Sequence, residues 1–501
     1  MSTFHGLEMA KRALFAQQSA LYTTGNNISN TNTEGYSRQR VNFETLPGFP
    51  TASRNRPQMP GQMGTGVDTG TVQRIRDQYL DYQYRTENSK NGYWETKSGA
   101  LGRMEELMNE LSENGLSKTM DQFWQSLQDL AVNPENSGAR SVVAQRGLAV
   151  AETFNYLSDS LHSIRSDQND QINVTVKDAN SIIEQVDSIN KQIKDLEVHG
   201  YLANDLYDER DRLIDELSGM INIKVTYTGS GGGSLAIADG LATIEVVDND
   251  GKTLSPAVKL VDGEQGTHQT IDVSYANEDQ QNAVTDITVG DTKIDITASN
   301  GSLKAFVEAY GYVNPEDRVV GEFPDMLADL DRMAAEFAKA FNKQHKAGND
   351  LNGEDGEDFF VNADSARTIT VNQQIVDNPD LIAAASKDEK SGDGENASAL
   401  GAVFHEELPG LGKKTSVKSF YESLIGELGV QSEKANRMTE NTTIIRSQIE
   451  QQRMSVSGVS LDEEMSNMIK FQHAYNAAAR SMTAIDEMLD RIINNMGLVG
   501  R

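Results

Sequence analysis

The segment LDEEMSNMIKFQHAYNAAARSMTAIDEMLDRIINNM, residues 461–496, repeats a seam of mostly apolar side chains at alternating spacings of four and three. This heptad spacing lets a helix bury one continuous seam against a partner helix. The segment therefore predicts a long coiled-coil helix at the end of the chain. Its seam consists of Leu461, Met465, Met468, Gln472, Tyr475, Ala479, Met482, Asp486, Leu489, Ile493 and Met496.

A second helix with the same seam spacing is predicted immediately before it, over residues 424–456. Ser457-Gly458 interrupts the register between the two helices. The stretch 460–463, Ser-Leu-Asp-Glu, is a capping-box sequence, in which the serine and glutamate side chains can satisfy free backbone N–H groups at a helix start.

The beginning of the chain predicts another amphipathic helix, from about Phe4 to Ile28, which the asparagine-rich stretch 26–32 ends in a turn. Polar residues interrupt its apolar stripe, as Gln472 and Asp486 interrupt the C-terminal seam. Since each buried Leu, Ile or Met contributes about 1.5–3 kcal/mol, these stripes favour burial against each other or against neighbouring chains. An ordinary helical core within one chain is the alternative.

Between the ends, four prolines predict an irregular excursion over residues 45–70. Helical spacing predicts long helices over 95–198, at least one of them above 25 residues, and a further short helix over 204–217. It also predicts helices over 303–312 and 323–346.

Residues 221–300 differ, because apolar and polar residues alternate in 221–227, 287–289 and 294–297. This pattern predicts a β-rich insertion, with Gly290-Asp291 as a hairpin turn. The acidic segments 348–358 and 387–396 are predicted loops, with at most a short strand at 369–371 between them.

Composition excludes several functional classes. The formal net charge of -30 argues against nucleic acid as a partner, because phosphate backbones are bound by clustered Lys and Arg. Nearly all of the excess acid lies in residues 94–415, which leaves both ends close to neutral. With no cysteine, neither a disulfide nor a thiol nucleophile is expected. No apolar run long enough for membrane insertion and no cleavable signal peptide is found, so neither is expected.

Candidate chemical sites fail on spacing. The seven histidines never approach metal-ligand spacing. Residues 350–361 resemble a calcium loop but have Asp355 where glycine is required and Val361 where glutamate is required. Residues 407–415 lack the first glycine of a phosphate-binding loop and have Lys414 at its hydroxyl position. We therefore expect no catalytic residue, cofactor or metal, and no enzyme activity.

Both ends carry recognisable motifs. The stretch from Ala13 through Asn26-Asn27-Ile28-Ser29-Asn30 to Gly35-Tyr36 resembles the N-terminal signature of flagellar rod, hook and hook-associated proteins. Residues 457–480, from Ser-Gly-Val-Ser-Leu-Asp-Glu-Glu to Ala-Ala-Arg, resemble the terminal motif of the same family. Ser37-Arg38-Gln39, residues 204–213 and residues 348–360 with Phe359-Phe360 are similar to the hook-associated protein 1 branch of that family.

The resemblance implies a mainly α fold with a β-rich insertion, in which the N- and C-terminal helices form a coiled-coil inner domain, followed by a long-helix second domain and an outer β domain. The boundaries expected for the terminal assembly domain are 1–93 with 457–501. For the helical domain they are 94–220 with 301–456, including a loop-rich acidic stretch at 348–415. The outer domain is expected over 221–300.

The implied function is that of a structural subunit of the extracellular bacterial flagellum, forming a homo-oligomeric ring at the junction between hook and filament. The implied partners are hook protein, a second hook-associated junction protein and an export chaperone on the C-terminal helices, and export is by the flagellar type III route without a cleaved signal peptide. The residues predicted to form the assembly interface are Leu7, Leu14, Leu21, Asn27, Ile28, Asn30, Thr33, Gly35, Tyr36, Leu461, Met465, Met468, Phe471, Tyr475, Ala479, Met482, Leu489 and Ile493.

Two other interpretations remain open at this point. A hook or distal-rod axial protein shares the terminal motifs and would form long homopolymers. An exported cell-wall hydrolase belongs to a different functional class, but the sequence shows no pair of residues spaced for that chemistry.

Overall fold

A computed structural model describes residues 4–50, 54, 56, 58, 60–108, 115–277, 280–295, 299–387 and 392–495. The chain divides into two compact units. Unit 1 comprises residues 1–88, 179–270 and 444–501, and unit 2 comprises residues 89–178 and 271–443. Three helices contribute residues to both units: α2 (Gln78–Met108), α4 (Ser137–Glu197) and α10 (Val417–Ser457).

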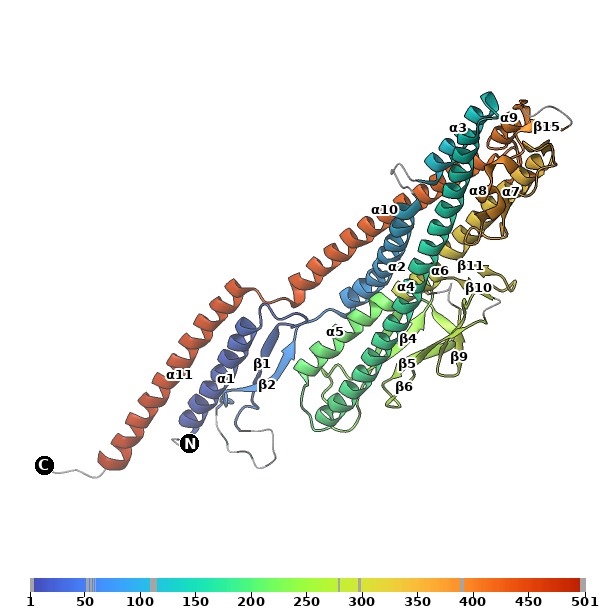
Figure 1. Cartoon of the computed structure of the whole chain (residues 1–501). Helices are drawn as coiled ribbons and strands as arrows, with labels where there is room; N and C mark the ends of the chain where they lie inside the picture. The colour runs from blue at the N-terminus through green and yellow to red at the C-terminus, as the bar shows by residue number, and fades with distance from the viewer. Residues whose placement is uncertain are drawn as a thin grey trace. The chain divides into compact units, whose positions relative to one another are not determined.

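The two ends of the chain pack together in unit 1. Helix α1 (Phe4–Ser29) lies along α11 (Leu461–Asn495), as Figure 1 shows, and also packs against the antiparallel pair β1 (Gln39–Thr45) and β2 (Val67–Arg74). The predicted terminal helices are therefore confirmed. The prediction of an irregular segment over 45–70 is wrong at its end, because Val67 already begins β2 and pairs with Thr45.

The rest of unit 1 is helix α5 (Asn204–Met220) and a four-stranded antiparallel sheet in the order β3-β4-β5-β6. Strand β4 lies inside this sheet, and six of its seven residues are buried. The strands are β3 (Ile223–Thr228), β4 (Leu241–Val247), β5 (Thr253–Asp262) and β6 (Thr267–His268).

Unit 2 combines helices with a second sheet in the order β11-β10-β8-β7, to which β9 adds on β8. Its helices are α3 (Leu116–Val132), α6 (Ser302–Tyr310), α7 (Glu322–His345), α8 (Gln373–Asp377) and α9 (Glu395–Ala402), with 3₁₀ turns η2 (Pro379–Leu381) and η3 (Pro409–Leu411). Its strands are β7 (Ile271–Tyr275), β8 (Val284–Val289), β9 (Thr292–Ile294), β10 (Tyr312–Val313) and β11 (Val319–Val320), and the short pairs β12 (Gly348–Asn349) with β15 (Ala385–Ser386) and β13 (Phe360–Val361) with β14 (Thr370–Val371).

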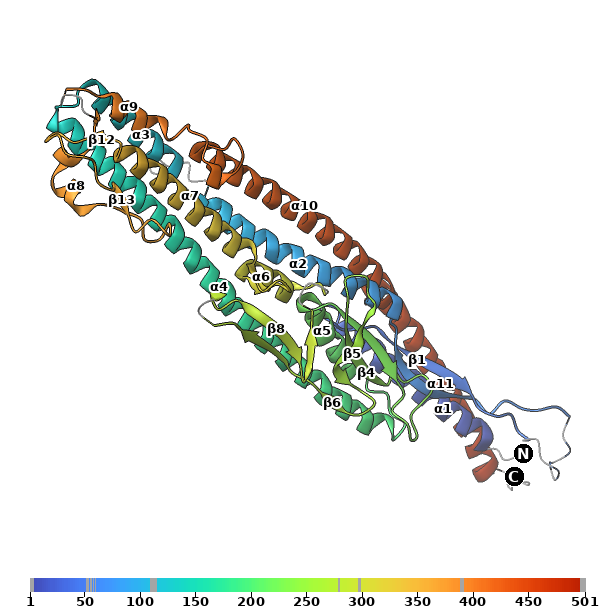
Figure 2. The same cartoon turned by 90° about the vertical axis from the view of Figure 1, so that its right-hand side faces the viewer.

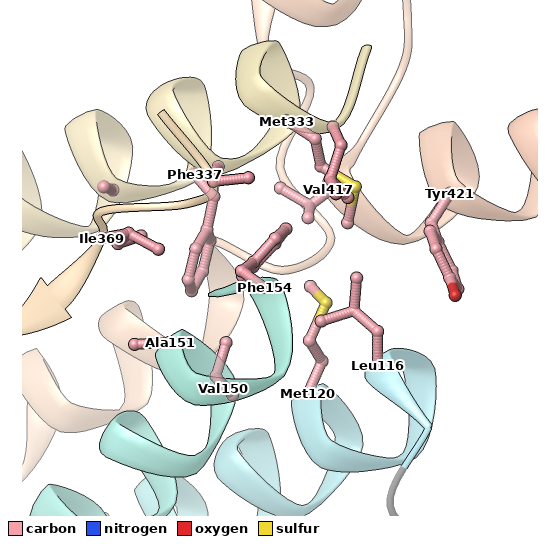
Figure 3. Close-up of a cluster of buried hydrophobic side chains, with 14 of the residues drawn as sticks. Leu116, Met120, Val150, Ala151, Phe154, Met333, Phe337, Ile369, Val417 and Tyr421 are labelled. Atoms are coloured by element: carbon pink, nitrogen blue, oxygen red, sulfur yellow. The ribbon is translucent and has the colours of Figure 1, made fainter. Parts of the chain in front are cut away.

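The core of unit 2 is apolar and rich in phenylalanine. Figure 2 shows α4 and α7 lying side by side, and Figure 3 shows Phe154 of α4 and Phe337 of α7 pointing into one cluster with Met120 of α3. Six phenylalanine rings of this core contact one another: Phe123, Phe337, Phe341, Phe359, Phe360 and Phe404. Aromatic pairs of this kind add about 0.5–1.5 kcal/mol beyond their buried area, so they concentrate stability at one end of the unit.

Several sequence predictions can be compared directly with these elements. The prediction of a helix above 25 residues is confirmed by α4, which has 61 residues. The start expected near residue 95 is wrong, because α2 begins at Gln78. Gly290 has a positive φ of 54° in the β8–β9 turn, which confirms the predicted hairpin. Residues 296–297 of the predicted last strand lie outside the described residues.

The predicted β-rich segment 221–300 forms two sheets rather than one. Strands β3–β6 belong to unit 1, while β7–β9 belong to unit 2. The three-domain division itself stays a prediction. None of the described helices is long and apolar enough to cross a membrane.

His345 holds the acidic loop after α7 in place through two hydrogen bonds. Its side chain is fully buried, its Nδ1–H donates to the carbonyl of Glu357 at 2.6 Å, and its Nε2 accepts the N–H of Ala383 at 3.0 Å. A carbonyl can only accept and an amide N–H can only donate, so this geometry requires the neutral ring. Burial lowers the pKa of His345 to about 4.

The stability of unit 2 should therefore fall in acid. The folded pKa lies below the unfolded value of 6.5, so the stabilisation is complete above about pH 6.5 and is lost as the pH falls toward 4. The expected loss is about 3 kcal/mol. Urea unfolding between pH 7 and pH 4 measures it, and His345→Gln, which cannot titrate, should lack this part of the pH dependence. Identical pH profiles for the two proteins would contradict the role given to His345.

Candidate assembly surface

The C-terminal helix buries only part of its predicted seam. Leu489 is buried, and Met468, Phe471, Tyr475, Ala479 and Met482 are partly buried. Leu461, Met465 and Ile493 remain 47%, 57% and 69% exposed. The helix therefore uses one face for contacts within the chain and leaves apolar side chains beside that face in solvent.

The exposed ends have a geometric cause. A side chain at Gly6 of α1 would lie 3.2 Å from Ile485, so the two helices run antiparallel and Ile492 and Ile493 extend past the first described residues of α1. At the other end of α11, Leu461, Met465 and Ile469 form a ridge at spacings of four, with Ile469 53% exposed. We call Leu461, Met465 and Ile469 the exposed ridge.

On α1 the buried positions differ from the predicted stripe. Ala10, Ala16 and Ala20 are buried, whereas Leu7, Leu14, Leu21 and Ile28 are only partly buried. Alanine permits close approach of α11 and of the β1–β2 pair, and the larger side chains lie at the flanks of that contact. Phe4, Phe15 and Tyr22, which share another face of α1, are 59%, 56% and 71% exposed.

The predicted motif after α1 forms a hydrogen-bonded turn centred on Asn27. Its Nδ2 donates to the carbonyl of Gln39 at 2.8 Å, and its Oδ1 accepts the N–H of Gln39 at 3.0 Å and the hydroxyl of Tyr36 at 2.8 Å. Asn30 accepts the hydroxyl of Thr33 at 3.1 Å through its Oδ1. Asn27 is 1% exposed, so its side chain serves the turn within the chain.

The same asparagine connects the N-terminal turn to the C-terminal helix. Asn27 Nδ2 also donates to Glu464 at 3.2 Å, and Glu464 is 3% exposed. The N–H of Arg38 donates to the carbonyl of Ser457 at 2.8 Å, and its guanidinium pairs with Glu463. Glu463 of the predicted capping box is thus engaged by Arg38, and the break between α10 and α11 is held by the N-terminal segment.

Gly35 is required where this turn meets α5. Its φ of 79° is a left-handed conformation, and a Cβ there would lie 3.3 Å from the Cβ of Arg212. Both conditions select glycine at this position.

Beneath the turn lies a buried cluster of arginines and aspartates, with Asp211 of α5 at its centre. Asp211 is 1% exposed and accepts Arg74 at 2.7 Å and Arg85 at 3.1 Å, with Arg76 at 3.6 Å. The hydroxyl of Tyr227 donates to it at 2.9 Å. One carboxylate thus connects β2, α2, α5 and β3.

The neighbouring aspartates extend the cluster to other parts of unit 1. Asp208 accepts Arg74 at 2.9 Å and the backbone N–H of Ser37 at 3.0 Å. Asp215 accepts Arg85 at 2.7 Å and also pairs with Arg453 near the end of α10. The cluster therefore contacts both the N-terminal turn and the last turns of α10.

The ionised state of each group in this cluster depends on its oppositely charged neighbours. Burial acts to raise the pKa of Asp211, but the surrounding guanidinium groups of Arg76, Arg74 and Arg85 outweigh it and hold that pKa well below its usual range. Burial raises the pKa of Asp208, where Arg74 opposes the effect only in part. Asp211 is consequently ionised at neutral pH.

The sequence interpretation missed this cluster, although a signal was present. Asp208, Asp211 and Asp215 lie at spacings of three and four, on one face of a predicted helix. Arg74 and Arg76 alternate in the way that places both side chains on one face of a strand. No spacing in the sequence, however, shows that these two faces meet.

Comparison with known proteins identifies the fold and the family. A family description for the "Flagellar hook-associated protein FlgK helical domain" matches residues 101–360, which is more than half of the chain. Descriptions for "Flagella basal body rod protein" and "Flagellar basal body rod FlgEFG protein C-terminal" match residues 7–36 and 450–496. The chain belongs to the flagellar hook-associated protein 1 family.

Individual relatives agree with this assignment. The chain is 46% identical to flagellar hook-associated protein 1 of Bacillus subtilis strain 168 over 510 aligned residues, covering 100% of each protein. It is 23% identical to flagellar hook-associated protein 1 of Escherichia coli K12, covering 97% of this chain and 98% of that one. The solved structure of the flagellar hook junction protein FlgK from Burkholderia pseudomallei shares the fold with a TM-score of 0.58, at 13% identity, over 75% of this chain and 100% of the other.

This family consists of structural proteins of the flagellum, and the chain is such a structural component rather than an enzyme.

In the loop that resembles a calcium site, the Asp350 carboxylate binds backbone N–H groups of the same loop. Asp350 Oδ1 accepts the backbone N–H groups of Asn352 and Glu354, each at 2.8 Å, so it shapes the turn.

Replacing Asp211 by asparagine should destabilise unit 1 strongly. The substitution keeps the size of the side chain but leaves buried guanidinium groups without their shared counter-charge, at an expected cost of about 3–5 kcal/mol. Urea unfolding followed by circular dichroism measures the loss. Glu216→Gln is the matched control, because Glu216 lies on the same helix and forms an exposed pair with Arg212, worth less than about 1 kcal/mol. Equal stabilities of the two variants would refute the central position of Asp211.

Proposed function

We propose that this chain is a subunit of a homo-oligomeric ring at the junction between the flagellar hook and the filament. The exposed ridge of α11 carries the proposal. A helix already packed against α1 still presents Leu461, Met465 and Ile469 to solvent, and grouped apolar side chains of this kind mark interaction sites. Burying them requires another chain.

The terminal helices are suited to this task because both helices of the pair retain exposed apolar surface. Phe15 and Tyr22, 56% and 71% exposed, offer a second contact surface on α1. In a ring each subunit meets neighbours on two sides, so two exposed surfaces on one helix pair provide the required contacts. Methionine on the ridge and at Met488, which is 59% exposed, can repack against neighbours of different shape.

The proposed interface comprises the α11 residues from Leu461 to Ile493 together with Leu7, Leu14 and Leu21 of α1. The motif after α1 contributes to this interface by holding the helix pair in a fixed position against the rest of unit 1. Its residues are Asn27, Ile28, Asn30, Thr33, Gly35 and Tyr36. Hook protein and a second hook-associated junction protein are the proposed axial neighbours. An export chaperone would cover the exposed ridge before assembly, during export without a cleaved signal peptide.

A three-domain organisation accompanies this proposal, with the terminal helices innermost, a long-helix domain next and a β-rich domain outermost. The near-neutral ends and acidic middle of the sequence support it, because contact-forming surfaces carry few uncompensated charges whereas solvated surfaces carry many. A hook or distal-rod protein, the alternative from the terminal motifs alone, is not favoured, since the relatives that match over the full length are hook-associated proteins.

Replacing the exposed ridge by serine should block assembly without unfolding the subunit. In Leu461→Ser, Met465→Ser, Ile469→Ser, little is lost in the free chain because all three side chains are already exposed, and the unfolding free energy should change by less than about 1 kcal/mol. Immunogold electron microscopy should show no label at the hook tip.

The control substitutes exposed polar residues that lie about 100° around the same helix from the exposed ridge: Ser466→Ala, Lys470→Ser and His473→Ser. This variant should label the hook tip normally. Wild-type labelling by the ridge variant would overturn the proposal, and label spread along the hook or rod would favour the axial alternative.

A further inference from the structure

Unit 1 contains a groove that the terminal helices do not line. It has a volume of about 510 Å³ and lies between Gln39 of β1, residues 70–72 of β2, Leu196 at the end of α4, residues 200–206 and Leu235. We call it the β2-edge groove. Cavities of roughly 300–1,000 Å³ accommodate a small molecule or a few large side chains.

Several apolar side chains are exposed at this groove or close to it in sequence. Leu196 is 40% exposed and Tyr201 is 67% exposed, while Val198 and Ile237, close by in sequence to Leu196 and Leu235, are 37% and 41% exposed. Single exposed apolar residues are ordinary, but a group of them beside a cavity marks a binding surface.

The walls of the groove are held in place by Glu197. This residue is fully buried, accepts the N–H of Gly240 at 3.1 Å, and also accepts the hydroxyls of Tyr207 and Ser230. The N–H of Gly233 donates to the carbonyl of Val198 at 3.2 Å. These bonds join the end of α4 to the segment 229–240, so the groove is formed before any partner arrives.

One side of the groove is a strand edge. Among the described strands, β2 pairs only with β1, and the side chain of Asn204 donates to the outward carbonyl of Val72 at 2.9 Å. An edge strand with neighbouring apolar side chains is the geometry that accepts an extended segment of another chain.

The chain itself offers a matching projection on the β1–β2 connection. Phe49 and Met63 are joined by two backbone hydrogen bonds of 2.9 and 2.8 Å and are 43% and 36% exposed. Residues directly opposite in an antiparallel bridge place their side chains on the same face, so the two form one apolar projection. Neither residue lines the β2-edge groove of its own chain.

The charges of the two surfaces are complementary. The sequence between Phe49 and Met63 contains Arg54 and Arg56 and no acidic residue. The groove side carries Asp68 of β2 and Asp205 of α5, and both are exposed.

We propose that the Phe49–Met63 projection of one subunit docks in the β2-edge groove of a second copy of this chain. Each subunit then donates a projection on one side and accepts one on the other, which is a head-to-tail contact that can close into a ring. The inference rests on the proposed function, because it supplies that ring with a contact separate from the terminal helices. It assigns the specific pairing of neighbours to unit 1.

Disulfide cross-linking tests this contact, since the natural chain has no cysteine. Two differently tagged copies, Phe49→Cys and Tyr201→Cys, are expressed together, and isolated flagella are oxidised and run on non-reducing gels. We expect a dimer that carries both tags and is absent when either variant is present alone. Phe49→Cys paired with Tyr156→Cys should give no dimer, since Tyr156 is a 54% exposed tyrosine on α4 of unit 2, away from the groove.

A photo-reactive phenylalanine analogue at Tyr201 of the full chain gives a second readout that needs no matched pair. Mass spectrometry of the product should identify a peptide from residues 46–66 of this same protein. A peptide from any other flagellar protein, or flagella that contain both cysteine variants without the dimer, would overturn the contact. Immunogold labelling of the hook tip distinguishes the two proposals. If the hook tip is labelled but no cross-link forms, only this contact is rejected. If the unsubstituted protein is not found at the hook tip, the proposed function is rejected.

Discussion

The buried carboxylate of Asp211 is the constraint on which unit 1 depends. It lies among the guanidinium groups of Arg74 in β2, Arg76 in the connection after β2 and Arg85 in α2, all far from α5 in the sequence. Charges in a medium of low dielectric are costly unless they are paired, so none of these segments can occupy its place without the others. The folding of unit 1 is therefore expected to be all-or-none across segments that are more than a hundred residues apart.

This rigidity has a consequence for the terminal helices. Asp208 holds the backbone of Ser37, and Asn27 and Glu464 fasten the turn after α1 to the start of α11. The turn after α1 is thus attached to a fixed base, and the start of α1 contacts the β1–β2 connection, where His5 Nε2 lies 3.3 Å from the carbonyl oxygen of Gly64. Ile493 of α11 extends past the first described residues of α1 and is 69% exposed.

The sequence predicted the helices well because their periodicity is a local property. It did not show which α1 side chains are buried within the chain, where Ala10, Ala16 and Ala20 are, since the closeness of approach depends on the partner's surface. The pair β1–β2 escaped prediction because a proline-rich connection separates its strands. The arginine–aspartate cluster was not predicted either. The sequence shows each half as one face of a helix or strand, but only the tertiary fold brings the two faces into contact.

The two units differ in what their cores contain. Unit 2 buries phenylalanines such as Phe337 and Phe359, which give stability with little geometric selectivity. Unit 1 buries aliphatic side chains, as in β4, together with the arginine–aspartate cluster, and buried paired charges permit few alternative arrangements. A subunit that must present an exposed apolar ridge needs such selectivity where the ridge is attached. The formal charge of -30, concentrated between residues 94 and 415, opposes indiscriminate association of free chains. In the proposed ring, this repulsion restricts burial of the ridge to neighbours whose surfaces match it.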